Sequence, residues 1–162
     1  MIAMLLAGLT LVAQEADAEP LLPDGRYAED VSEGDACANE DGRFFTLVPA
    51  DPSDPAEYGS IVADFGGAVI DMPLSMTSMH ARDLADGAIQ GVGVVQARDA
   101  SSTRLMMTLL LGADGRYVVG QVLVTPQGGE MQHVVRMVDD PLPHGIASDG
   151  SVLEPFRYCG PQ

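Results

Sequence analysis

The stretch RLMMTLLLGADGRYVVGQVLVTPQGGEMQHVVRMV, residues 104–138, decides the fold. Every second residue from Leu105 to Leu111 is apolar, which is the period of a β-strand that buries one face. Residues 112–115 and 126–129 are rich in Gly, Asp and Pro, and they separate this segment from two further ones, 116–125 and 130–138. The second segment is rich in β-branched residues and the third alternates in polarity, so the stretch predicts three antiparallel strands joined as two hairpins.

Strand patterns continue on both sides of this stretch. We expect further strands at Ala88–Ala97, Arg43–Val48, Tyr58–Phe65, Ala68–Met72 and Val152–Cys159. Ser75–Asp86 is the one segment with a helical pattern, and it ends at a possible glycine cap, Gly87. Together these elements predict an all-β, mainly antiparallel fold: a single small barrel or sandwich of about eight strands with at most one short helix.

The tripeptide Asp-Gly-Arg followed by an aromatic residue occurs three times, at 24–27, 41–44 and 114–117. Each copy predicts a turn with its Gly at positive φ, followed by a strand. Gly25-Arg26-Tyr27 at the opening of a predicted barrel, with a Cys near the C-terminus, resembles the layout of lipocalins and avidins. Those families usually carry Gly-x-Trp at this point and the chain has no Trp, so the resemblance transfers no function and we assign no family.

The first residues resemble an export signal. Residues 1–13 are uncharged and mostly apolar, but the run is shorter than the roughly 20 residues that span a bilayer. Ala16-Asp17-Ala18 follows with the small-residue pattern that signal peptidase accepts. We therefore expect a signal peptide at 1–18 and a single exported β domain at 19–162, in the periplasm or secreted, whose first part (19–42) is acidic and loop-rich.

The chain carries a formal net charge of −16, with 24 acids against 8 basic residues. Such a negative field repels phosphate backbones and anionic headgroups. We therefore expect no nucleic-acid partner and no membrane insertion after signal cleavage. High charge also keeps an exported protein soluble.

Cys37 and Cys159 are the only cysteines. In an oxidising compartment two cysteines most often pair, and two thiols without nearby histidines make a poor zinc site. We predict one structural disulfide that ties the two ends of the domain together.

No nucleophile elbow, phosphate loop, dinucleotide fingerprint or zinc-protease motif occurs, so we predict no catalytic residues. His133 lies on an apolar strand pattern and His144 in a predicted loop. We therefore expect a non-enzymatic module that binds an unknown small apolar ligand or a protein partner, and that needs no cofactor. The apolar pattern on both faces of Leu105–Leu111 indicates either a second layer or a surface used in association.

The alternative is a periplasmic copper-binding protein. Met72, Met76 and Met79 stand close to His80 in the sequence, and thioethers with an imidazole suit Cu(I). The same spacing also suits one stripe of a helix, where methionine commonly fills a core. Core packing is the interpretation that we favour.

Overall fold

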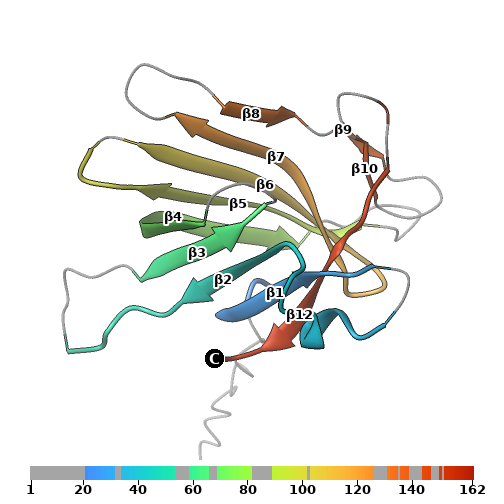
Figure 1. The fold of residues 1–162 in the computed structure, drawn as a ribbon, viewed down its shortest axis with the longest axis horizontal. Coiled ribbons are helices and arrows are strands. Elements are labelled where there is room, and N and C mark those ends of the chain that lie inside the picture. Colours follow the sequence, from blue (N-terminus) through green and yellow to red (C-terminus); the bar gives the residue numbers. More distant parts are fainter. Residues whose placement is uncertain are drawn as a thin grey trace, which may run out of the picture.

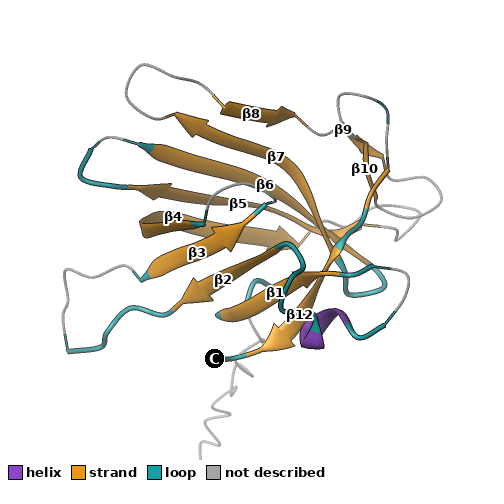
Figure 2. Ribbon diagram, in the orientation of Figure 1, coloured by secondary structure: helices purple, strands orange, loops and turns teal. Residues whose placement is uncertain are grey.

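The structure is a computed structural model, and it describes residues 21–31, 34–53, 59–65, 69–81, 89–101, 103–125, 131–134, 136–138, 144–146, 150 and 152–162. These residues form an all-β closed antiparallel barrel (Figures 1 and 2), with one short 3-10 helix, η1 (Ala36–Ala38), and no α-helix among them. The predicted fold class is confirmed, and the barrel is the correct one of its two alternatives. The predicted signal segment lies outside the described residues.

The barrel strands follow one another around the wall in the order β12, β1, β2, β3, β4, β5, β6, β7, and a pairing between Phe156 and Tyr117 closes β12 onto β7. The barrel strands are β1 (Gly25–Glu29), β2 (Phe44–Val48), β3 (Ser60–Asp64), β4 (Ile70–Ala81), β5 (Ile89–Arg98), β6 (Arg104–Gly112), β7 (Tyr117–Thr125) and β12 (Phe156–Gly160). β8 (Met131–Val134) pairs with the second half of β7. A small second sheet contains β9 (Arg136–Val138), β10 (His144–Ile146) and β11 (Val152–Leu153).

Strand length divides the barrel into two halves. β4 to β7 have 12, 10, 9 and 9 residues, and we call them the long wall. β12, β1, β2 and β3 have 5 residues each, and we call them the short wall. Because barrel strands are tilted and staggered, the short wall meets only one end of each outer strand of the long wall. β3 pairs with Ile70–Pro73 of β4, and β12 pairs with Tyr117 of β7.

The two hairpins predicted for residues 104–138 are present as β6, β7 and β8. The third predicted strand, Glu130–Val138, is divided: β8 joins the barrel sheet and β9 joins the small sheet. The predicted last strand is divided in the same way into β11 and β12, on either side of Glu154 and Pro155. Proline cannot donate a ladder hydrogen bond, which explains the break at this position.

Two local predictions are wrong. Residues 75–81 of the predicted helix continue β4 as a strand, and its remainder lies outside the described residues. The reason is tertiary: after a bulge between Leu74 and Met76, this segment pairs residue by residue with β5, which overrides its local propensity. His144 lies in strand β10 and not in a loop. The segment 19–42, which we expected to be loop-rich, contains the strand β1, and β1 supplies a central strand of the short wall.

All three Asp-Gly-Arg copies do launch strands, because β1, β2 and β7 begin at Gly25, Phe44 and Tyr117. Gly25 and Gly115 have positive φ, as predicted, whereas Gly42 does not. At Gly25 a side chain is also excluded by space, because a Cβ there would lie 2.2 Å from the carbonyl oxygen of Gly160. This glycine lets β1 and β12 approach each other closely.

The predicted disulfide is confirmed: Cys37 and Cys159 are bonded, with their Cα atoms 5.4 Å apart. It joins η1 to β12, and η1 also contacts β1. The bridge therefore fastens the C-terminal strand to the segment that connects β1 and β2. It holds together the half of the barrel that has the shortest strands.

Candidate functional site

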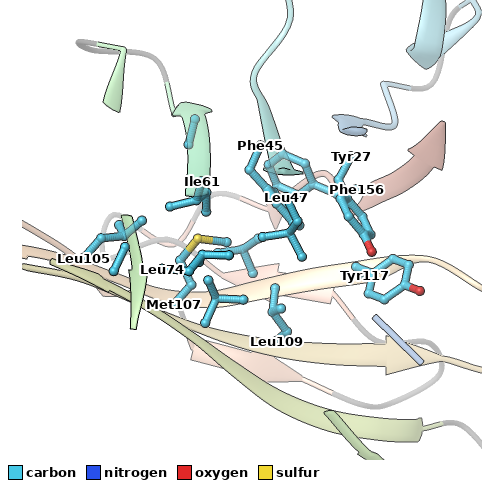
Figure 3. Close-up of a cluster of buried hydrophobic side chains, with 14 of the residues drawn as sticks. Tyr27, Phe45, Leu47, Ile61, Leu74, Leu105, Met107, Leu109, Tyr117 and Phe156 are labelled. Carbon is cyan, nitrogen blue, oxygen red and sulfur yellow. The ribbon is translucent and has the colours of Figure 1, made fainter. Parts of the chain in front are cut away.

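The interior of the barrel is packed with side chains from both walls. Figure 3 shows the short-wall side chains pointing across the interior toward those of the long wall. They belong to Tyr27, Phe45, Leu47, Ile61 and Phe156 on one side, and to Leu74, Leu105, Met107, Leu109 and Tyr117 on the other. The rings of Tyr27 and Phe45 stack at 4.4 Å between centroids, and Phe156 lies 5.4 Å from Phe45. The described side chains of the interior thus form one hydrophobic core that joins the two walls.

Residues 21–24 lie across the barrel beside the closing seam and are held by three tyrosine hydroxyls, which we call the tyrosine clamp. The hydroxyl of Tyr117 donates to the carbonyl oxygen of Leu21 at 2.9 Å, and that of Tyr158 to the carbonyl oxygen of Asp24 at 2.8 Å. The hydroxyl of Tyr27 donates to the carbonyl oxygen of Pro23. Leu21 and Leu22 pack against the core below.

Burial raises the pKa of the Tyr27 hydroxyl strongly above its ordinary value, and burial also raises the pKa of Tyr117. Both hydroxyls therefore stay protonated and keep donating at physiological pH. A general base needs a pKa near the working pH, so these tyrosines have a structural role in holding the N-terminal segment.

A pocket of about 130 Å³ lies on the surface beside the C-terminus, between Asp24–Gly25, Thr46–Pro49 and Pro161–Gln162. Sites for drug-sized ligands usually have about 300–1,000 Å³. This pocket is too small to hold such a molecule, and of the core residues named above only Leu47 lines it.

Ion pairs of the described residues gather on the short wall and at the turn next to it. Arg43 pairs with Glu29 at 3.2 Å, and Asp30 accepts from Arg157 at 2.9 Å and lies 3.8 Å from Arg116. Burial raises the pKa of the Glu29 carboxyl, while Arg43 acts in the opposite direction. Each carboxylate faces an arginine, so these groups join neighbouring segments of the chain.

The outer surface of the long wall has the opposite character. The outward side chains of Met76–His80 on β4, Val92–Gln96 on β5 and Met106–Thr108 on β6 include no Asp, Glu or Arg, in a chain of net charge −16. Two arginines, Arg98 and Arg104, point outward at the adjoining ends of β5 and β6 and border this surface. We call this surface the uncharged face, and its residues are Met76, Ser78, His80, Val92, Val94, Gln96, Met106 and Thr108. Met76 is 43% exposed and Val92 is 36% exposed. Two large apolar side chains are thus open to solvent on adjacent strands.

Toward β7 the same wall is covered. Leu110 and Val118 also point outward, yet they are only 6% and 2% exposed and form a second buried cluster with Ile89. β9 and β10 contact β7 at this side of the barrel (Figure 1). The chain therefore buries apolar surface at the β7 side and leaves it open at the β4 side.

The four predicted copper ligands do not lie together. Met72 is 3% exposed and belongs to the core, and Met79 packs against the same core. Met76 and His80 are exposed on the outer face, four residues apart on one strand, which corresponds to about 13 Å between their Cα atoms. Strand alternation sends Met79 and His80 to opposite sides, and the bulge after Leu74 sends Met72 and Met76 to opposite sides, whereas a helix would have stacked all four.

No group of three or more His, Cys, Asp or Glu residues that could hold a metal occurs in the part of the chain that the structure describes. The side chains of His133 and His144 lie outside what is described. The sequence signal for the uncharged face was present but unused: residues 72–81, 89–97 and 105–112 contain no charged residue. Only the register between β4, β5 and β6 shows that these three segments make one surface.

Comparisons of this chain with protein-family models, with curated proteins and with solved structures find no match. Among the described residues, no helix has the length and apolar character needed to cross a membrane.

Proposed function

We propose that this chain is an exported, non-enzymatic binding module that recognises a protein through the uncharged face, rather than a small ligand in its interior. The observation that carries the proposal is the contrast between the hydrophobic core of the described interior and the uncharged face, on which Met76 and Val92 are exposed. Large apolar patches on soluble proteins commonly mark association sites. The cores of protein interfaces are likewise depleted of charged residues and enriched in Met and aromatic residues.

Export is supported by the signal pattern in residues 1–18 and by the Cys37–Cys159 bridge, since disulfides persist in oxidising compartments. Fractionation of cells that produce the whole chain, followed by N-terminal sequencing, tests this part. We expect the mature protein outside the cytoplasm, beginning at Glu19. Intact chain in the cytoplasm with both thiols free would contradict it.

Native mass spectrometry of the purified mature protein separates the two kinds of ligand. We expect masses of the polypeptide alone or of protein complexes, with no apolar small molecule in stoichiometric amount. A lipid or similar molecule that co-purifies in a one-to-one ratio would overturn the preference for a protein partner.

Site-specific photocrosslinking in the producing cells locates the contact surface. A photoreactive residue replaces Val92 on the uncharged face, and a matched variant carries it at Val62, which is half-buried on β3 of the short wall. We expect a discrete protein adduct from position 92 and not from position 62. Equal labelling from both positions, or none from position 92, would remove the uncharged face as the binding site.

A further inference from the structure

The stagger of the barrel leaves a half-strand of the long wall without a short-wall neighbour at each side. At the β7 side the second half of β7 extends beyond β12, and β8 pairs with Gln121–Val124 of this half. At the β4 side the short strand β3 pairs only with Ile70–Pro73. Met76–Ala81 pair with β5 on one side, and no described strand pairs with them on the other.

This open edge lacks the features that usually prevent strand addition. Natural sheets protect an edge with charged residues, proline or a bulge. β4 has a proline at Pro73 and a bulge between Leu74 and Met76, but both precede the open part. The open part itself, MTSMHA, has no charge, no proline and no described bulge.

Charge narrows the choice of occupant. Two copies of a chain with net charge −16 repel each other, so they can meet only where carboxylates do not face each other. The open edge and the uncharged face beside it provide such a region. A cationic partner would instead be attracted to acidic residues such as the exposed Asp71. The open part of the edge contains no acidic residue, so it does not favour a cationic partner.

The open edge is also complementary to itself. An antiparallel pair of β4 strands around a two-fold axis at Ser78 places Met76 opposite His80 and Ser78 opposite Ser78 on the outer side. It places Thr77 opposite Met79 on the inner side. Residues directly opposite each other must point to the same side of the joined sheet, and this register satisfies that condition from Met76 to His80.

We propose that a second copy of this chain binds the open edge, so that β4 pairs with β4 of the partner around Ser78 and the two uncharged faces become one continuous surface. The inference rests on the proposed function in one respect, namely that this side of the long wall is a contact surface. An edge of six residues buries little area, and contacts of this size are weak and reversible. We expect a dissociation constant on the order of 10 μM or higher.

Sedimentation velocity of the mature, disulfide-bonded protein over a concentration series tests the dimer. We expect a reversible monomer–dimer equilibrium that tightens as salt is raised from about 10 to 150 mM, because salt screens the repulsion between the acidic copies. Ser78→Lys places two like charges opposite each other at the axis and should weaken the dimer about tenfold or more. The matched variant Ser60→Lys, on the outer side of β3, should leave it unchanged.

A cysteine at the axis tests the register. All cysteines of the described chain are already paired, so Ser78→Cys introduces a single free thiol. Directly opposed residues of an antiparallel pair lie close enough to form a disulfide. We expect Ser78→Cys to give a covalent dimer under mild oxidation, faster than Ser60→Cys.

Each outcome has a distinct meaning. A monomer at all concentrations overturns the dimer, and the proposed function then stands or falls by the crosslinks from Val92. A dimer that Ser78→Lys leaves intact, or that Ser78→Cys does not link, overturns the β4 register. A dimer that co-purifies with a stoichiometric apolar molecule supports this inference and overturns the proposed function.

Discussion

The two walls of the barrel are stabilised in different ways. The long wall relies on its ladders: strands of 9 to 12 residues pair along almost their whole length. The short wall has strands of 5 residues, and around it lie the disulfide, the pairs Arg43–Glu29 and Arg157–Asp30, and the tyrosine clamp. Short ladders provide few backbone hydrogen bonds, and side-chain connections supplement them here.

This difference also explains which wall has an outer surface that ion pairs do not cover. Where side chains are used to fasten neighbouring segments, the outer surface is occupied by charged pairs. The ion pairs described above do not extend onto the uncharged face, where Met76 and Val92 are open to solvent. We therefore expect changes on the short wall to affect stability, and changes on the uncharged face to affect association.

The largest expected effect is the loss of the disulfide. Replacing both Cys37 and Cys159 by Ser frees β12 and η1, and the chain-entropy model assigns about 4–5 kcal/mol to a loop of this length. Urea denaturation of the double variant should show a free energy of unfolding lower by about that amount. A loss below about 1 kcal/mol would mean that the short wall is held mainly by its other contacts.

Alkaline pH tests the seam where the two walls meet. The pKa values of Tyr27 and Tyr117 are raised by burial, so the unfolded chain loses these protons first. The stability that the two protonated hydroxyls contribute to the folded state is fully present below pH 10 and is lost as the pH rises above it. For each tyrosine the free energy of unfolding should fall by at most about 1.4 kcal/mol per pH unit.

Denaturant midpoints between pH 8 and pH 11.5 measure this effect. In Tyr117→Phe one titrating group is absent, so the decline should be shallower than in the parent protein. Equal slopes for both proteins would show that Tyr117 does not contribute to the alkaline loss.

A matched pair of valines compares the two faces of the long wall. Val95 is 0% exposed and Val92 is 36% exposed, and both lie on β5. Val95→Ala removes buried methyl groups and should lower the free energy of unfolding by about 2 kcal/mol. Val92→Ala should change it by less than about 0.5 kcal/mol. Similar losses in both variants would indicate that the uncharged face is covered in the monomer.

The sequence predicted most of the long wall because its strands carry their own signal. The alternation of Leu105, Met107 and Leu109, with turns at defined positions, specified β6 and its two neighbours. The pairing of Cys37 with Cys159 followed from the count of cysteines and the expected compartment. Strand alternation is a local pattern, and two cysteines can pair in only one way, so neither prediction needs knowledge of the fold.

The rest depended on contacts between distant segments. Ser75–Ala81 has a helical spacing of methionines, and only its pairing with β5 makes it a strand. Together with the bulge after Leu74, this pairing places Met72 and Met79 toward the core and Met76 and His80 on the outer surface. The tyrosine clamp joins residues as far apart as Leu21 and Tyr117, and no pattern within either segment indicates their contact.

The smallest predicted effect compares two members of the clamp. Tyr117 and Tyr158 each donate one hydrogen bond to a carbonyl of residues 21–24, but Tyr117 is 6% exposed whereas Tyr158 is only half-buried. Tyr117→Phe should lower the free energy of unfolding by about 1 kcal/mol, because the Leu21 carbonyl then loses its partner next to the core. In Tyr158→Phe, water can replace the hydroxyl at Asp24, and we expect a loss below about 0.5 kcal/mol.

Urea denaturation at pH 7 measures the free energy of unfolding of both variants, and amide exchange at residues 21–24 shows whether the N-terminal segment is released. If the two variants lose the same stability, the number of hydrogen bonds and not their burial determines how firmly the clamp holds.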